Sequence, residues 1–502
     1  MKIAVVGSGY VGLVASACFA KLGHEVACID RDRGKIDILL SGRLPIYEPG
    51  LQDLVNSGVG NGSLMFGTDL PQAVSRAEAV FIAVGTPDIG DDGRPDLTSV
   101  FAVAREIAAA ASGFTVVVTK STVPVGTGDA IETVMSAILP RERFAVVSNP
   151  EFLREGRAIE DFDHPDRIVI GADCEWAREV MAQIYDPRHF PDVPMIFTSR
   201  RTAELMKYAS NAFLAAKIAF INDMSDLCEN ARANVCDLAR GMGLDARIGR
   251  DFLEAGPGYG GSCLPKDTRA LVRMATDHGA PLAIFEAIVA ANNRRKRRLA
   301  ARIVEACGDA IEGKTIGLLG LTFKANTDDM RESPALPLIE DLKLLGANIR
   351  AYDPAGMANA ARLVDDVVFT ADPYDCANGA HALVIVTGWS EFQALDLQKI
   401  RSSLIVPIVI DFRNILDPVE MAANGLAYIS VGRASVQPLH ILDQGAVLHV
   451  SPSLAGLSEH RIARTGGTAG GQMPNQAKAD AGLVALSSLV LAEEDFGHPD
   501  PR

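Results

Sequence analysis

Three glycines follow a short apolar run within the first twelve residues. The run Lys2–Val6 leads directly into Gly7, Gly9 and Gly12, which have the spacing G-x-G-x-x-G. This order predicts a buried strand, a tight turn and a helix. The first glycine allows the turn, the second lets a ligand approach the backbone N–H groups, and the third lets the helix pack on the strand. The chain is therefore expected to begin with a doubly wound α/β domain.

The same segment predicts a dinucleotide site. Asp30 ends the next predicted strand, 18 residues after Gly12. The helix N-terminus favours a diphosphate, and a carboxylate at Asp30 can accept hydrogen bonds from both ribose hydroxyls. That carboxylate would repel a 2'-phosphate and so favours NAD over NADP. The neighbouring cations Arg31, Arg33 and Lys35 keep NADP open.

Apolar runs alternate with amphipathic segments over the first two hundred residues. This alternation predicts a parallel sheet with helices on both faces. The runs are Lys2–Val6, Glu25–Asp30, Val80–Val84, Thr115–Thr119, Phe144–Ser148 and Arg167–Ile170. The residues Val84–Pro87 follow one of these strands, where Thr86 would face the ligand crevice.

The pattern of apolar residues changes twice after residue 198. Between about Ser199 and Ala310, Ala-rich helical patterns dominate, and Pro281–Glu305 reads as one long helix. Strands are expected again at Thr315–Leu319, Asn348–Tyr352, Val367–Thr370, Ala382–Thr387 and Ile405–Asp411. The predicted fold is two Rossmann-like doubly wound domains joined by a helical region, with a flexible C-terminal tail. The expected boundaries are 1–198, 199–310, 311–435 and 436–502.

Charge and cysteine usage exclude several classes. The formal net charge is -15, so the whole chain would repel nucleic acid and anionic membranes. No uninterrupted apolar run reaches about 18 residues, which predicts no transmembrane helix. Eight scattered cysteines without C-x-x-C pairs predict reduced thiols in a cytoplasmic protein, and the nine histidines show no metal spacing. The basic run Arg294–Arg298 is expected to be a solvated helix face.

A second segment predicts a reactive cysteine. Residues Gly256–Asp267 read GPGYGGSCLPKD, and Cys263 stands where a helix is expected to begin. Helix N-terminal N–H groups and the nearby Lys266 would lower the pKa of this thiol. A nucleophilic thiolate beside a nicotinamide suits aldehyde oxidation, because the thiolate first forms a thiohemiacetal that can lose hydride to give a thioester.

Several motifs in one order resemble the UDP-glucose/GDP-mannose dehydrogenase family over roughly residues 1–433. They are Gly7–Val14, Val84–Pro87, Lys120–Thr127, Asn149–Gly156, Lys207–Ala215, Gly256–Asp267 and Gly320–Ala335. The resemblance implies NAD-dependent four-electron oxidation of a sugar-nucleotide at C6, with two NAD consumed per substrate. It also implies a homodimer and a role in polysaccharide biosynthesis. Residues Asp161–Gly171 look like the UDP-glucose branch, so UDP-glucose is the expected substrate.

The resemblance also assigns roles to residues. Cys263 would be the nucleophile, Lys207 and Asn211 would stabilise oxyanions, and Asp267 and Thr122 would hold water or relay a proton. Glu155 would assist hydrolysis or lie beside the nicotinamide, and Glu151 would contact substrate and water. The expected cofactor-binding residues are Gly7, Gly9, Tyr10, Val11, Gly12, Asp30, Lys35, Thr86, Thr122, Glu155, Lys266 and Arg331. The expected substrate-binding residues are Glu151, Phe152, Leu153, Arg154, Glu155, Lys207, Asn211, Arg247, Phe252, Leu253, Glu254, Ala255, Gly256, Tyr259, Gly260, Lys324 and Arg413, with Arg247 reaching across a dimer interface.

Three alternatives stay open. The same chemistry could act on GDP-mannose or a UDP-N-acetylhexosamine. A two-electron hydroxyacid dehydrogenase shares the glycine turn and a helical middle domain but needs no cysteine. A non-catalytic sensor of NAD or sugar-nucleotide would use the tail as its interaction element.

Overall fold

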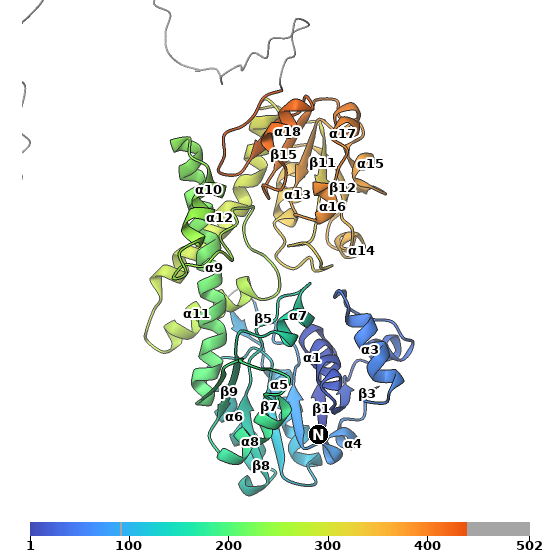
Figure 1. Cartoon of the computed structure of the whole chain (residues 1–502), viewed down its shortest axis with the longest axis vertical. Coiled ribbons are helices and arrows are strands. Elements are labelled where there is room, and N and C mark those ends of the chain that lie inside the picture. Colours follow the sequence, from blue (N-terminus) through green and yellow to red (C-terminus); the bar gives the residue numbers. More distant parts are fainter. Residues whose placement is uncertain (91–92, 439–502) are drawn as a thin grey trace, which may run out of the picture. The chain divides into compact units, whose positions relative to one another are not determined.

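The described chain contains two large β-sheets, each with helices packed against it, and a helical segment that separates them in the sequence (Figure 1). The computed structural model describes residues 1–90 and 93–438, and all of these lie in one compact unit. The expected flexible tail therefore lies outside the described residues from residue 439 onward. Within the described ranges, no helix is both long enough and apolar enough to cross a membrane.

The first sheet has the strand order β10-β9-β8-β7-β4-β1-β2-β3. All neighbours pair in parallel except β8 and β9, which are antiparallel and depart from the expected parallel sheet. The chain leaves β8, passes through a loop and the short helix α7, and re-enters the sheet from the same end. The strands are β1 (Lys2–Val6), β2 (Glu25–Ile29), β3 (Leu64–Gly67), β4 (Ala79–Ile82), β7 (Thr115–Thr119), β8 (Phe144–Ser148), β9 (Ile168–Ala172) and β10 (Met195–Thr198), with a separate hairpin of β5 (Asp88–Ile89) and β6 (Arg94–Pro95).

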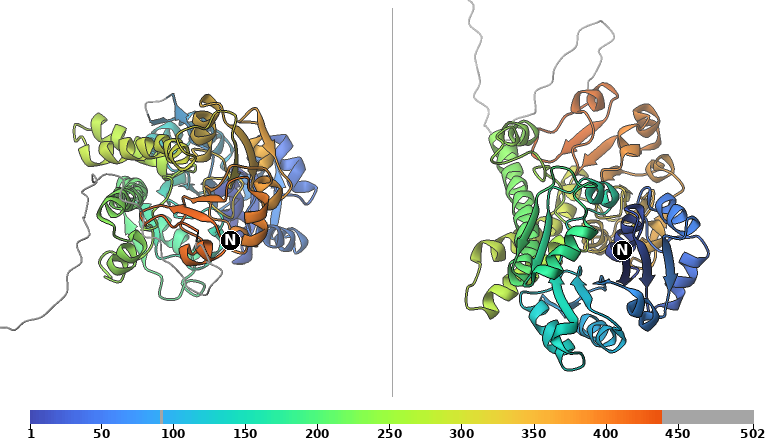
Figure 2. Two further views of the ribbon diagram at one scale, coloured as in Figure 1. Left: turned by 90° about the horizontal axis from the view of Figure 1, so that it is seen from above. Right: turned by 60° about the horizontal axis from the view of Figure 1, so that its bottom comes forward.

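Helices cover both faces of this sheet (Figure 2). The central strands β4, β7 and β8 are buried along their whole length, which is why they are continuously apolar. One apolar core lies on each face. The helices are α1 (Tyr10–Lys21), α2 (Arg33–Leu40), α3 (Leu51–Gly60), α4 (Leu70–Arg76), α5 (Thr98–Ala110), α6 (Thr127–Ser136), α7 (Ala158–Asp163) and α8 (Glu175–Ile184), with a 3-10 turn at Arg141–Arg143.

The middle of the chain is helical, as expected. Helix α9 has 32 residues, and the Ser199 side chain caps its N-terminus by accepting a hydrogen bond from Thr202 N–H. One turn later, the buried Glu204 carboxylate accepts from the backbone N–H groups of Gly126 and Gly128, which fastens α9 to the first sheet's α6. The helices are α9 (Arg200–Ala231), α10 (Val235–Gly243), α11 (Leu264–Asp277) and α12 (Ala283–Ala306).

The basic run lies on α12. Arg295 and Arg298 pair with Asp226, and Arg297 pairs with Glu340 and Asp341. The pairing with acids agrees with the expectation, but the expectation of a solvated face was wrong for Arg295 and Lys296, which are 9% and 6% exposed because α9 and the loop before α11 cover this side of α12.

The second sheet has the order β13-β12-β11-β14-β15-β16, and every neighbouring pair is parallel. This is the doubly wound order 3-2-1-4-5-6. Its strands are β11 (Thr315–Leu319), β12 (Asn348–Tyr352), β13 (Val367–Phe369), β14 (Ala382–Ile385), β15 (Ile408–Asp411) and β16 (Ala427–Ser430). Its helices are α13 (Ala335–Leu344), α14 (Met357–Ala360), α15 (Pro373–Ala377), α16 (Ser390–Gln393), α17 (Leu397–Ser403) and α18 (Pro418–Ala423).

The expected strands agree closely with the observed ones. Five of them, β1, β7, β8, β11 and β12, have the predicted ends, and six others differ by one to three residues at an end. The strands β3, β10 and β16 and the hairpin were missed. The two edge strands β3 and β10 are short and only partly buried, so they lack a continuous apolar signal. The predicted domain boundaries stay predictions.

Candidate active site

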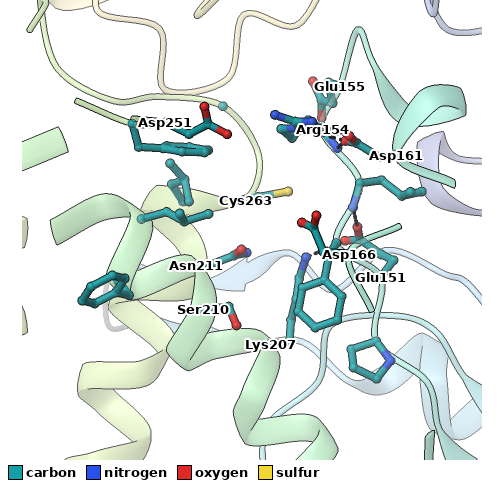
Figure 3. A pocket seen from close by; sticks show the side chains of 18 of the residues that line it. Glu151, Arg154, Glu155, Asp161, Asp166, Lys207, Ser210, Asn211, Asp251 and Cys263 are labelled. Carbon is teal, nitrogen blue, oxygen red and sulfur yellow. Dashed lines mark hydrogen bonds and ion pairs between the residues drawn. The ribbon is translucent and has the colours of Figure 1, made fainter. Parts of the chain in front are cut away.

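A cavity of about 790 Å³ contains Cys263 in its lining. Three parts of the chain contribute most of its wall: the loop after β8, one face of α9, and the loop that leads into α11. The second sheet adds Phe323, Lys324 and Arg413. Figure 3 shows Cys263, Asn211, Lys207 and Glu151 gathered in this pocket.

Cys263 is the N-cap residue of α11, as the sequence predicts. Its surroundings differ from the expectation, however. Burial raises the pKa of the thiol to about 11, while Lys207 acts to lower it. Lys266 was expected to supply the activating cation, but its ammonium is 2.6 Å from the Asp267 carboxylate. The cation that acts on the thiol comes from α9 instead.

Lys207 and Glu151 form a buried ion pair. The Lys207 ammonium donates to Glu151 Oε1 at 2.8 Å, and the two side chains are 3% and 5% exposed. Burial favours the neutral form of each group, but their mutual attraction prevails, so the pKa of Lys207 is raised and that of Glu151 is lowered. Both groups are therefore charged at neutral pH.

Asn211 lies one turn after Lys207 on the same face of α9. Its amide donates to Asp267 Oδ2 at 2.6 Å, and Asp267 is only 1% exposed. The Asp267 carboxylate thus accepts from Asn211 on one oxygen and from Lys266 on the other. Asp267 is held behind Asn211 and is not part of the cavity wall.

Glu155 lies in a different electrostatic environment. Burial and the negative charge of Asp329 raise the pKa of Glu155 to about 7. Ser262 Oγ donates to Glu155 Oε1 at 2.8 Å, and Arg331 lies 3.5 Å from the same oxygen. Glu155 is therefore poised to gain or lose a proton near neutral pH.

The glycine turn has the shape that a bound diphosphate requires. Gly7 has a φ of 111°, and a Cβ on it would lie 2.5 Å from the Ala83 carbonyl oxygen. A Cβ on Gly12 would lie 1.9 Å from the Gly7 oxygen, whereas a Cβ on Gly9 would meet nothing within 4 Å. The backbone is thus crowded on the protein side and open at Gly9, which fits a dinucleotide at the N-terminus of α1.

Asp30 directly follows β2 and lies beside this turn. Its carboxylate accepts from Ser8 N–H at 2.7 Å, from Ser8 Oγ at 2.8 Å and from Asp32 N–H at 2.9 Å. Burial opposes ionisation, but these hydrogen bonds lower the pKa of Asp30. An ionised carboxylate here fits a ribose diol and opposes a 2'-phosphate.

Tyr10 links the glycine turn to the loop after β8, which carries Glu155. Its hydroxyl donates to the buried carboxylate of Glu48. That carboxylate also accepts from the backbone N–H groups of Gly156 and Ala158, at 2.6 and 2.8 Å. Glu48 therefore joins the start of α1 to the loop that carries Glu155.

Most of the expected substrate residues line the cavity, and the others lie elsewhere. The lining includes Glu151, Phe152, Leu153, Arg154, Glu155, Lys207, Asn211, Phe252, Glu254, Gly256, Tyr259, Gly260, Cys263, Lys324 and Arg413. Leu253 and Ala255 are buried in the apolar core. The Arg247 side chain is 89% exposed and pairs with Asp245.

The residues expected at the cofactor lie outside the cavity wall, apart from Glu155. Thr86 Oγ1 donates to the carbonyl oxygen of Thr122 at 3.0 Å, so these two residues are adjacent. Arg331 pairs with Asp329 at 2.7 Å and reaches Glu155. The Lys35 backbone N–H donates to Asp32, and its side chain has no ion pair in the described part of the chain.

Sequence reasoning missed many residues of the cavity wall, and three of them make contacts that bear on its chemistry. Ser262 contacts both Glu155 and Cys263. Lys120 is 4% exposed, and its ammonium donates to Asn149 Oδ1 and Tyr185 Oη, each at 3.1 Å. The Arg167 guanidinium stacks on the Phe152 ring, 3.7 Å from its centroid. Each of them lies inside or beside a motif that had been quoted, so motif membership was the available signal.

Comparison with known proteins gives matches along nearly all of the described chain. Residues 1–189 match the NAD binding domain of the UDP-glucose/GDP-mannose dehydrogenase family, 201–294 match its central domain, and 317–418 match its UDP binding domain. A UDP-glucose 6-dehydrogenase of Rhizobium meliloti (strain 1021) is 55% identical over 86% of this chain and 100% of the relative. The UDP-glucose 6-dehydrogenase TuaD of Bacillus subtilis (strain 168) is 44% identical over 87% of this chain and 94% of the relative.

Solved structures agree with these matches. A UDP-glucose dehydrogenase from Pyrobaculum islandicum has a TM-score of 0.78 and 37% identity, over 86% of this chain and 98% of that chain. A UDP-D-ManNAc dehydrogenase from Pyrococcus horikoshii has a TM-score of 0.76 and 27% identity, over 86% and 99%. The chain belongs to the UDP-glucose/GDP-mannose dehydrogenase family. Its cofactor is NAD, and its second sheet belongs to a UDP binding domain.

Proposed function

We propose that this chain catalyses the NAD-dependent oxidation of UDP-glucose at C6 to UDP-glucuronate, a four-electron reaction that consumes two NAD. Relatives named UDP-glucose 6-dehydrogenase are 40–55% identical to this chain over most of its length. Bound NAD supplies a hydride acceptor. The remaining chemistry belongs to the side chains of the cavity.

The observation that carries the proposal is the position of Cys263. Its thiol lines a cavity whose wall also contains the Lys207 ammonium, the Asn211 amide and the Glu151 carboxylate. Oxidation of an alcohol gives an aldehyde, which cannot lose a second hydride until a nucleophile has added to it. The Cys263 thiolate adds to the aldehyde carbon, the thiohemiacetal loses hydride to become a thioester, and water releases the carboxylate.

Lys207 and Asn211 stabilise the oxyanion that forms at each addition step. They lie one turn apart on α9 and both reach the cavity. The Lys207 ammonium stays protonated because its pKa is raised, and it can therefore donate hydrogen bonds throughout the reaction. Asp267 orients the Asn211 amide, and together with Thr122 it holds the water or relays the proton.

Arg413 and Lys324 bind the UDP portion. In the described part of the chain the Arg413 guanidinium has no ion pair; it donates to the carbonyl oxygens of Val386 and Phe323 at 2.8 and 2.9 Å. Burial lowers the pKa of Arg413 to about 10, and the attraction of the nearby Asp411 carboxylate offsets only part of this effect. A diphosphate or ribose oxygen in the cavity supplies a further partner for the cation.

The remaining expected residues complete the proposal. Glu151 contacts the substrate and the water, and Glu155 assists hydrolysis. Lys266 and Arg331 lie at the cofactor end. The loop residues from Phe252 to Gly260 hold the nucleotide. The enzyme acts in the cytoplasm as a homodimer, with Arg247 reaching the partner's site, and it supplies UDP-glucuronate for polysaccharide synthesis.

The deciding experiment counts NADH. Purified protein with limiting UDP-glucose and excess NAD is expected to form about two NADH per sugar-nucleotide, because one hydride leaves at each of two steps. Cys263→Ser is expected to lose turnover to the acid, with Cys174→Ser, at an exposed cysteine, as the matched control. A ratio of about one, or an active Cys263→Ser variant, would indicate two-electron chemistry. No NADH from UDP-glucose but NADH from GDP-mannose or a UDP-N-acetylhexosamine would change the substrate, and no NADH from any would favour a sensor.

A further inference from the structure

Ser262 lies between the nucleophile and a glutamate from a distant part of the chain. Its hydroxyl oxygen is 2.8 Å from Glu155 Oε1 and 3.4 Å from Cys263 Sγ. Glu155 follows β8, whereas Ser262 and Cys263 precede α11. Ser262 therefore connects Cys263 to Glu155. Among the described residues that line the cavity, Glu155 is the carboxylate whose pKa is near 7.

The direction of these two hydrogen bonds follows from the chemistry of a hydroxyl group. A serine has one O–H proton, and here it is donated to the Glu155 carboxylate. The contact between Ser262 Oγ and Cys263 Sγ must then be an S–H···O hydrogen bond, with the thiol as donor. While Glu155 is ionised, this assignment directs the thiol proton toward Ser262 and the Ser262 proton toward Glu155.

We propose that Ser262 relays the thiol proton of Cys263 to Glu155 and so generates the nucleophilic thiolate. The S–H bond breaks as Ser262 Oγ takes that proton, and the Ser262 O–H bond breaks as Glu155 Oε1 takes the serine proton. Ser262 ends unchanged, one proton has moved from sulfur to the carboxylate, and no other reactant is needed. This role deepens the proposed function, because it names the group that activates Cys263.

The transfer is unfavourable at equilibrium, because the pKa of Cys263 is about 11 and that of Glu155 about 7, but the charges around the two ends reduce its free-energy cost. Glu155 faces Asp329, which opposes its negative charge, while Arg331 and Lys324 act in the opposite direction. The thiolate end faces the Lys207 ammonium, with Glu151 and Asp267 opposing it. The transfer removes a negative charge beside Asp329 and creates one beside Lys207. Both neighbours therefore lower the free-energy cost of the transfer.

Burial explains why a relay is needed. Burial raises the pKa of Cys263 to about 11, so few thiols ionise spontaneously at neutral pH. Glu155 titrates at about 7 and is largely available as a base just above neutrality. Without Ser262, the thiol would lose the hydrogen-bonded path to that base.

The test is the rate at which iodoacetamide alkylates Cys263, followed by mass spectrometry of the Cys263 peptide between about pH 6 and about pH 9. Neither sugar-nucleotide nor NAD is added, so the result does not depend on the substrate. We expect Ser262→Ala to slow alkylation roughly tenfold near pH 8, because it removes a hydrogen bond to a developing charge. Ser262→Thr keeps a hydroxyl and is expected to restore most of the rate.

Glu155→Gln separates a relay from simple electrostatics. Gln keeps the hydrogen bond from Ser262 but cannot take its proton, so the relay predicts slower alkylation. If charge alone mattered, removing a nearby anion would lower the thiol pKa and speed alkylation. The double variant is expected to be no slower than either single one. Glu160→Gln, at an exposed glutamate of α7 paired with Arg157, is the control and should leave the rate unchanged.

The outcomes are distinct. Faster or unchanged alkylation in Glu155→Gln, or no rescue by Ser262→Thr when thermal melts show that all variants fold, would overturn the relay. The protein could instead make no NADH from UDP-glucose while alkylation still depends on Ser262 and Glu155. That result would support the relay and contradict the proposed substrate.

Discussion

Two glutamates of the loop after β8 carry opposite pKa shifts. Glu151 is fully buried, yet its contact with Lys207 keeps its pKa below the usual value. Burial and Asp329 raise the pKa of Glu155 to about 7. One glutamate is therefore a permanent anion that holds Lys207, and the other is a group able to exchange a proton. Neighbours from elsewhere in the chain, not the residue type, separate their roles.

The shift of Glu155 predicts how stability depends on pH. Between its usual pKa of 4.5 and about 7, the folded protein holds a proton that the unfolded chain has lost. The Glu155 contribution to the free energy of unfolding therefore falls as pH rises through this range, and the full penalty is present above pH 7. The difference in the free energy of unfolding between Glu155→Gln and the wild type is therefore expected to be roughly 3 kcal/mol more in favour of the variant at pH 8 than at pH 4.5.

Urea unfolding at several pH values measures this difference. Glu160→Gln serves again as the control, because the exposed Glu160 has a lowered pKa and should contribute no change above pH 4.5. Parallel curves for the wild type and Glu155→Gln would show that Glu155 is not protonated at neutral pH in the folded state.

At the scale of the element, two glycines within six residues of the N-terminal strand–turn–helix serve different purposes: one is needed for packing and the other for ligand binding. Gly12 is required for α1 to pack against the turn, because a Cβ there would overlap the Gly7 oxygen. Gly9 touches nothing on the protein side and has a φ of -72°, which any residue can adopt. The two glycines therefore have different reasons for being glycine.

This difference predicts a matched pair of variants. Gly12→Ala is expected to lower the melting temperature by several degrees, since about 2 kcal/mol or more of overpacking strain is typical. Gly9→Ala should melt like the wild type but bind NADH at least about tenfold more weakly, because its methyl group occupies the approach of the diphosphate. Melting curves and NADH fluorescence titrations measure both effects. Equal NADH affinity in Gly9→Ala would mean that the dinucleotide does not approach this turn.

At the scale of the whole molecule, α9 carries a stripe of exposed apolar side chains. Phe213, Phe220 and Leu227 are seven residues apart and are 63%, 44% and 56% exposed. Residues at this spacing lie on one helix face, and an exposed apolar face of this kind marks an interaction surface. A second copy of the chain is the proposed partner.

Light scattering after size exclusion measures the assembly. The wild type is expected to have the mass of a dimer, and Phe220→Glu with Leu227→Glu is expected to give a monomer, because each buried charge lacks a partner at such an interface. Leu344→Glu on α13 is the control, since Leu344 is 80% exposed but lies off this stripe. A wild-type monomer, or a dimer that survives the double substitution, would contradict the proposed interface.

Local sequence determined most of the fold. Buried strands such as β7 and β11 are continuous apolar runs, the G-x-G-x-x-G spacing predicts its turn, and α9 has a helical period. These signals depend only on neighbours along the chain. Edge strands such as β10 were missed because their burial, and hence their composition, is weak. The strand β9 was predicted, but its antiparallel direction was missed, because strand direction depends on how the chain returns to the sheet.

For the candidate site, the sequence by itself supplied the residue types and the motifs, including Cys263 at a helix start. The tertiary structure alone decided their partners and charges. Lys207 contacts Glu151, 56 positions away in the sequence, Ser262 contacts Glu155, 107 positions away, and Lys266 pairs with Asp267. A pKa is set by burial and by charges a few ångströms away in space, and neither quantity can be read from neighbours along the chain.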